Sequence, residues 1–146
     1  MQIGERSPVY LIAKVPPEVA ISELIGDCIE IYLMPDKEHP ETGFQFVINS
    51  SGALWDARHP LDKFLDLSWN SSARTVIKIE KDRWIVKIAN PMAEVSLTPG
   101  QERKANFYRS HVVDEGQTYL CWSPVLRENH FTPERFGTLI IQKKQD

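Results

Sequence analysis

The chain has 146 residues, 42% of them hydrophobic, which is enough for one substantial core, so we expect a single domain over residues 1–146. Charges of both signs are mixed along the chain and leave a formal net charge of -3 at pH 7, which offers no basic field for nucleic acid or an anionic membrane. We therefore expect neither nucleic acid nor a membrane as a partner, and we also expect a monomer. The longest apolar run near the N-terminus, residues 9–13, is too short to span a bilayer. The opening residues lack the basic start and apolar segment of a signal peptide, which indicates a cytoplasmic or a processed chain.

Short runs of β-branched and aromatic residues, bounded by Pro, Gly, Asp or Asn, recur along the whole chain. In chain order, the expected strands are residues 9–15, 29–33, 44–48, 53–57, 74–80, 84–89, 105–110, 118–122 and 138–142. The third and fourth of these runs, and the fifth and sixth, are separated by short turns and should form two hairpins. This spacing, with almost no helical period, predicts an all-β protein.

Alternation along the second hairpin places Trp84, Val86 and Ile88 on one face, which should enter the core. Two short helical turns are expected, one at residues 92–96 and one at residues 133–137, the latter closed by its glycine. Together these elements predict a β-sandwich of the jelly-roll or immunoglobulin-like kind.

The two cysteines, Cys28 and Cys121, each lie in an apolar run. Their spacing matches neither a metal motif nor a dense disulfide framework. Because free cysteine behaves as a small hydrophobe, we expect two buried free thiols rather than one disulfide.

Three segments, in order, carry a recognisable pattern: GDCIEIYL at residues 26–33, DRWIVKIANP at residues 82–91 and HFTPERFG at residues 130–137. They resemble the D-x-x-E strand, the tryptophan strand and the C-terminal element of the family 9 carbohydrate-binding modules and their DOMON-like relatives. The resemblance implies a non-catalytic β-sandwich that binds sugar, often at the end of a glycan chain. Such modules are usually attached to, or secreted with, polysaccharide-degrading enzymes, so a role accessory to polysaccharide degradation is also implied.

The resemblance includes departures at the sugar-contacting positions. Two aromatic residues clamp the sugar ring in characterised members, and the resemblance places Leu24 and His130 there. An arginine expected on a hairpin strand is replaced by Val47, and a glutamate in the tryptophan strand is replaced by Lys87. Among the polar sugar contacts, Glu30 is retained.

Members of this family begin with some tens of further residues that supply strands and, in some members, calcium ligands. The sequence has no counterpart of this region, so we expect either a shortened domain or a truncated start. Calcium binding is compatible with the resemblance, but no calcium site is visible in the sequence and no other cofactor is expected.

The candidate ligand-binding residues are Glu30, Asn49, Arg109, Trp122 and His130. Glu30 alternates with two isoleucines, so it faces away from them, and it either accepts from sugar hydroxyls or pairs with a basic side chain, Arg109 or Lys87. Trp122 is either an exposed stacking surface or a core residue. His130 either contacts a sugar or anchors the last loop, while Asn49 is a turn residue first and a ligand contact second. A sugar site would require Glu30, Trp122 and His130 to share one concave surface.

No serine-nucleophile elbow, His-Glu-x-x-His motif, phosphate loop or dinucleotide fingerprint is present, so we expect no enzyme activity. Two other functions stay open. The departures from the family pattern allow a sandwich that has lost sugar binding and serves as an interaction domain. A haem-binding domain of the DOMON type would use Met34 or Met92 with His111 or His130 as axial ligands.

Overall fold

The computed structural model describes residues 8–15, 27–61, 65–113, 116–126 and 130–143. Within these ranges each of the expected strands has a counterpart, and there is one short 3₁₀ helix. In chain order, the elements are β1 (Pro8–Val15), β2 (Cys28–Met34), β3 (Gly43–Asn49), β4 (Leu54–His59), β5 (Arg74–Ile79), β6 (Trp84–Pro91), β7 (Glu102–Val113), β8 (Gly116–Cys121), η1 (Pro133–Arg135) and β9 (Gly137–Ile140). The all-β prediction is therefore confirmed.

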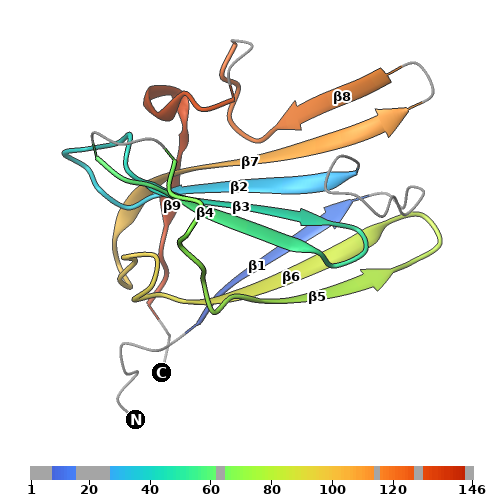
Figure 1. Cartoon of the computed structure of the whole chain (residues 1–146), viewed down its shortest axis with the longest axis horizontal. Helices are drawn as coiled ribbons and strands as arrows, with labels where there is room; N and C mark the ends of the chain where they lie inside the picture. The colour runs from blue at the N-terminus through green and yellow to red at the C-terminus, as the bar shows by residue number, and fades with distance from the viewer. Residues whose placement is uncertain (1–7, 16–26, 62–64, 114–115, 127–129, 144–146) are drawn as a thin grey trace.

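The strands form two antiparallel sheets (Figure 1). The smaller sheet has the order β1-β6-β5, and the larger sheet has the order β4-β3-β2-β7-β8. The long strand β7 pairs with β9 through its first residues and with β8 through its last ones. Both expected hairpins are present, β3 with β4 and β5 with β6.

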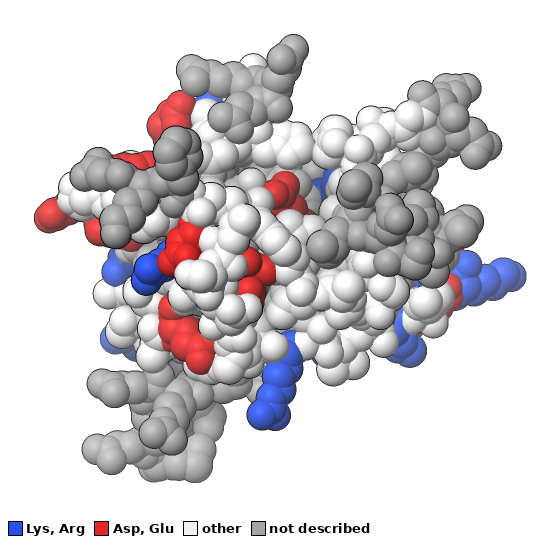
Figure 2. All heavy atoms as spheres, viewed as in Figure 1, with Lys and Arg blue, Asp and Glu red and all other residues white. Residues whose placement is uncertain are grey.

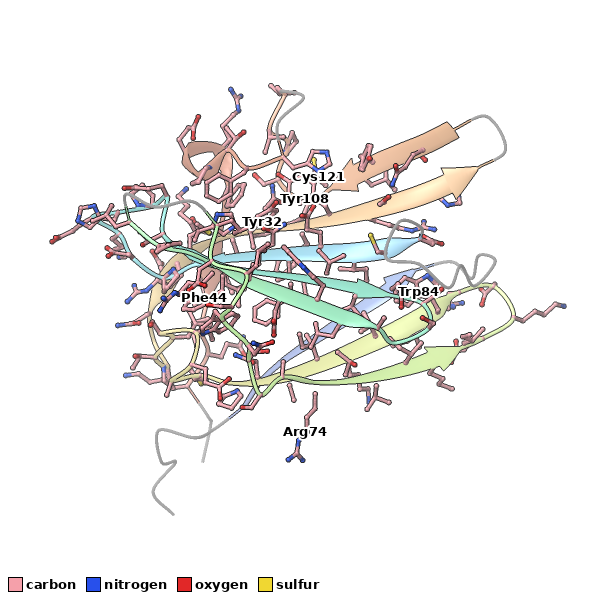
Figure 3. All side chains as sticks on the ribbon, in the orientation of Figure 1. Tyr32, Phe44, Arg74, Trp84, Tyr108 and Cys121 are labelled. Atoms are coloured by element: carbon pink, nitrogen blue, oxygen red, sulfur yellow. The ribbon has the colours of Figure 1, made fainter. Side chains whose placement is uncertain are left out.

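The main hydrophobic core lies between the two sheets. Because successive strand residues point to opposite faces, β2, β3 and β6 each contribute every second residue to this core, as expected for Trp84. The side chain of Trp84 is fully buried and is labelled in Figure 3. The buried residues of this core are Ile29, Ile31, Leu33, Phe44, Phe46, Ile48, Trp84, Val86, Ile88, Met92, Val95, Leu97, Ala105 and Ile141.

The opposite face of the larger sheet, called the outer face below, carries a second apolar cluster. Tyr32 and Met34 from β2 and Tyr108 from β7 pack there against Val125 and Phe136 from the C-terminal segment. This segment therefore covers part of the outer face. The neighbouring part of the outer face is the part on which a ligand could bind.

Two expected helical turns have different outcomes. Residues 92–96 form successive turns rather than a helix, and the amide of Leu97 donates to the carbonyl of Met92 at 2.9 Å. The second turn is present as η1, but its cap is Phe136 in an extended conformation, and the glycine that was expected to close it is the first residue of β9. Among the described residues, no helical segment has the length and hydropathy that a transmembrane span requires.

Both cysteines are free thiols, as expected, but only one of them is buried. Cys28 lies in β2, inside the larger sheet, whereas Cys121 ends β8, a strand at the edge of that sheet whose six residues are all exposed. The prediction of two buried thiols is therefore wrong for Cys121. An apolar run at a sheet edge does not bury its members as a central strand does.

Candidate functional site

The outer face of the larger sheet carries a row of side chains that crosses five strands. The strand register places Glu30 of β2 directly opposite Val47 of β3 and Tyr108 of β7. The same register extends the row to Trp55 of β4 and Cys121 of β8. Figure 3 labels Tyr108 and Cys121 near each other on this part of the molecule. Glu30 therefore stands at the centre of a mainly apolar row.

Neutral donors hold one oxygen of the Glu30 carboxylate. The hydroxyl of Tyr32 donates to Oε1 at 2.9 Å, and Nε2 of Gln45 donates to the same oxygen at 2.5 Å. The other oxygen, Oε2, lies 3.6 Å from Nδ1 of His130, and the carboxylate side chain keeps 18% of its surface exposed. The geometry thus fixes Glu30 through Oε1 and leaves Oε2 on the His130 side.

A chain of hydrogen bonds orients the amide of Gln45. Nε2 of His59 lies 2.9 Å from Oε1 of Gln45, and burial lowers the pKa of His59, so its ring is neutral at neutral pH. His59 also stacks on Phe131, with ring centroids 4.3 Å apart and an interplanar angle of 6°. With His59 as the donor, the amide nitrogen of Gln45 points to Glu30.

Aromatic rings surround His130 and fix its position. It stacks on Tyr108, with centroids 4.8 Å apart and an interplanar angle of 12°, and it meets the ring of Tyr119 edge-on at 4.7 Å. The hydroxyl of Tyr108 donates to the backbone carbonyl of His130 at 2.6 Å. His130 therefore has the contacts of a loop anchor and also lies beside Glu30. Tyr119 remains 53% exposed and offers an accessible aromatic surface at the edge of this group.

The hydroxyls of the two buried tyrosines of this site, Tyr32 and Tyr108, remain protonated over the physiological range. Burial, followed by the charge of Glu30, raises the pKa of Tyr32 far above its ordinary value. Burial also raises the pKa of Tyr108 to about 12, against a lowering from its hydrogen bond with Asn106. The carboxylate of Glu30 consequently faces neutral phenols.

Asn49 fills the turn role. It ends β3 with only 1% of its surface exposed. Its Oδ1 accepts from the amide of Ser51 at 3.1 Å, the hydroxyl of Ser51 at 2.7 Å and the amide of Ala53 at 2.9 Å. These bonds stabilise the β3–β4 turn through Oδ1.

The basic residues considered as partners for Glu30 lie elsewhere. Arg109 points to the inner face of the larger sheet, where its Nε and Nη2 are 3.3 Å from the two carboxylate oxygens of Asp27. His111 Nδ1 also approaches Asp27, at 4.0 Å. Lys87 is exposed on β6, in the smaller sheet. Neither basic side chain pairs with Glu30, and Leu24 lies outside the described residues.

Trp122 follows β8 and packs on the inner side of the larger sheet. Its amide donates to the carbonyl of Phe107 at 2.9 Å, and the two rings are 5.4 Å apart. A Cβ atom on Gly137 would lie 2.5 Å from the Trp122 ring, so the ring covers this glycine. Although Trp122 is 52% exposed, it does not share the outer face with Glu30 and His130.

Replacing Gly137 with alanine tests this packing. The added methyl group should displace the Trp122 ring, lower the free energy of unfolding by about 1 kcal/mol and shift the tryptophan emission. Urea unfolding and fluorescence would measure both effects, with Thr138→Ala, an exposed neighbour on β9, as the control. An unchanged emission spectrum would show that the ring does not lie on Gly137.

The structure therefore brings together Glu30 and His130 from the expected set and adds residues that sequence reasoning missed. The added residues are Tyr32, Gln45, His59, Tyr108 and Tyr119. For Tyr32, alternation with the core residues of β2 indicated that its side chain lies on the same face as that of Glu30. The others depend on strand register and on the C-terminal segment, for which the sequence carries no local signal.

The basic side chains do not gather in one place on the face of the molecule that Figure 2 shows. In Figure 2, lysine and arginine side chains project at separate places, mostly around the margin of the face shown. A hollow of about 730 Å³ lies near the β2–β3 loop, and its lining includes Asp36, Arg58, His59 and Arg103. It shares His59 with the Glu30 group but does not include Glu30 or His130. No group of three His, Cys, Asp or Glu side chains within the described ranges is placed to hold a metal ion.

Known proteins resemble this chain in structure but not in sequence. The sequence matches no protein-family model and no curated protein sequence. The structure is similar to that of a family 9 carbohydrate-binding module from Caldicellulosiruptor kristjanssonii in complex with cellotriose, with a TM-score of 0.67 and 14% identity over 97% of this chain and 72% of that one. It is also similar to a proposed carbohydrate-binding protein from Bacteroides uniformis, with a TM-score of 0.67 and 17% identity over 91% of this chain and 72% of that one. The chain therefore has the β-sandwich fold of the family 9 carbohydrate-binding modules.

Proposed function

We propose that the chain is a non-catalytic carbohydrate-binding module that acts as a monomeric, single-domain accessory to polysaccharide degradation. Its sugar site is the part of the outer face around Glu30. The observation that carries this proposal is the Glu30 carboxylate, held through Oε1 by Tyr32 and Gln45, with Oε2 beside the aromatic group of His130, Tyr108 and Tyr119. A related fold with bound cellotriose supports a sugar as the ligand.

The chemistry of this surface suits a pyranose. The C–H side of a sugar ring packs on an aromatic ring, and its hydroxyl groups donate to a fixed carboxylate oxygen. Tyr119 supplies the exposed ring, and Glu30 supplies the acceptor. Val47, in place of a basic residue, gives the row an apolar floor next to Glu30.

Isothermal titration with monosaccharides and with cello- and xylo-oligomers tests the proposal. Replacing Glu30 with alanine should weaken binding roughly tenfold to a hundredfold, because a hydrogen bond to a charged group is lost. Lys87→Ala, on the exposed side of the smaller sheet, should leave the affinity unchanged. The proposal fails if no glycan gives heat or retards the protein in affinity gels.

A second candidate function is supported by a different surface. Leu120 and Trp122, at and just after the edge strand β8, are 60% and 52% exposed. Large exposed apolar side chains at a sheet edge mark interaction surfaces. We propose, as the alternative, an interaction domain that binds a protein partner through this edge. This alternative predicts that Leu120→Ser abolishes partner capture while Glu30→Ala does not.

A further inference from the structure

Among the described residues, no lysine or arginine pairs with the carboxylate of Glu30. Its direct cross-strand neighbours on the outer face are Val47 and Tyr108. Its neighbours along β2 and on the two diagonals are also uncharged: Cys28, Tyr32, Gln45, Asn49, Asn106 and Ser110. Among the described residues, the one titratable base within ion-pairing distance is His130, at 3.6 Å.

The nearest lysine and arginine along β7 are engaged elsewhere. Nζ of Lys104, on the outer face, donates to the carbonyl of Phe136 at 2.9 Å. Arg109 points to the inner face and pairs with Asp27. Neither can neutralise Glu30 without giving up a contact that it makes in the folded chain.

Three neighbouring groups respond to this charge. After burial, the next largest cause that raises the pKa values of Cys28 and Tyr32 is the charge of Glu30, and the same charge raises that of Tyr108 more weakly. The charge of Glu30 therefore reaches three groups around it on the outer face. It will attract a cation that can reach Oε2.

We infer that the site takes an amino sugar, whose ammonium group pairs with Oε2 of Glu30. This inference rests on the proposed function and specifies its ligand class. The exposed ring of Tyr119 adds a face on which a cation is also attracted. The same charge disfavours uronic acids and sulfated sugars, because a like charge would approach a partly buried carboxylate.

The test compares three β-1,4-linked oligomers of equal length by isothermal titration at low salt. They carry an amine, an N-acetyl group or a hydroxyl at the same ring position: glucosamine, N-acetylglucosamine and glucose oligomers. The glucosamine oligomer should bind about tenfold more tightly than either neutral oligomer, because a charge-assisted hydrogen bond replaces a neutral one. This preference should shrink as salt is added.

Two variants distinguish an effect of the Glu30 charge from an effect of the net negative charge of the protein. Glu30→Gln removes the charge but keeps an oxygen that accepts from Tyr32 and Gln45, and it should abolish the preference for the amine. Glu41→Gln removes an equal charge from an exposed position outside the site and should keep the preference. Because the comparison among oligomers uses the unaltered protein, it decides the matter even if Glu30→Gln fails to fold.

The possible outcomes distinguish this inference from the function on which it rests. If the neutral oligomers bind as tightly as the glucosamine oligomer, or if the preference persists in Glu30→Gln, the amino-sugar inference is wrong and carbohydrate binding stands. If none of these oligomers binds and no other glycan does, both are wrong.

Discussion

Replacing Arg109 with methionine should lower the free energy of unfolding by about 3–5 kcal/mol, the cost of leaving a buried charge without its partner. The side chain of Asp27 is 2% exposed and that of Arg109 is 12% exposed, and two guanidinium nitrogens lie 3.3 Å from the two carboxylate oxygens. Without the arginine, Asp27 would retain the more distant His111 at 4.0 Å. The midpoint of urea unfolding should fall while its slope is unchanged.

The same substitution decides whether Arg109 belongs to the sugar site or to the framework. Because it points to the inner face, the folded variant should keep the ligand affinity of the unaltered chain. Asp27→Asn combined with Arg109→Met should recover part of the lost stability, since the buried carboxylate is removed together with the guanidinium that pairs with it. A variant with normal stability and lost sugar binding would contradict this assignment and place Arg109 in the site.

Local patterns were sufficient to predict most of the strands. The two hairpins have short turns and alternating apolar residues, so both their strands and the core face of Trp84 could be read from neighbouring residues. The helix expected at residues 92–96 is absent for a reason that lies in the packing of the same segment. Residues 92–96 follow a proline as a helix would, but Val95 and Leu97 are drawn into the core by turns.

The site was less predictable because it depends on the pairing of distant strands. Alternation placed Glu30 opposite the core isoleucines, and this holds in the structure. Whether Arg109 or Tyr108 meets Glu30, however, depends on the register between β2 and β7, where a shift of one residue exchanges the two faces. No feature near either strand specifies that register.

Gly137 was expected to close a helical turn, but its small size is required by a residue that is distant in the sequence. Glycine after a helical turn usually adopts a left-handed conformation, but Gly137 begins β9 instead. It is small because the ring of Trp122, distant in sequence, occupies the place of a side chain. Trp122 is thereby held on the inner side, away from Glu30.

Raising the pH above about 9 should destabilise the protein by on the order of 5 kcal/mol before pH 12 is reached. Burial raises the pKa of Cys28 from 9.0 to about 11, and it raises the pKa of Tyr108 from 10.0 to about 12. Tyr32 is raised further. Each increase of about 2 corresponds to about 3 kcal/mol.

The sign follows from which state keeps its protons. Between the ordinary and the raised pKa, the unfolded chain has released protons that the folded chain still holds, so stability falls as the pH rises. The contribution of these groups is fully present below the ordinary pKa values and is lost as the pH passes through the raised ones. A typical domain is stable by 5–15 kcal/mol, so alkaline unfolding should occur within this range of pH.

Urea unfolding at a series of alkaline pH values measures the effect. Tyr108→Phe and Cys28→Ala should each reduce the loss of stability with pH, because each removes one group that the folded chain keeps protonated. Cys121→Ala, which removes an exposed thiol from the same sheet, is the matched control for Cys28→Ala. A constant unfolding midpoint from pH 8 to pH 11 in the unaltered protein would show that these groups ionise freely in the folded state. The tight phenol and carboxylate arrangement around Glu30 would then be wrong as well, since the pKa of Tyr32 depends on the same burial and the same charge.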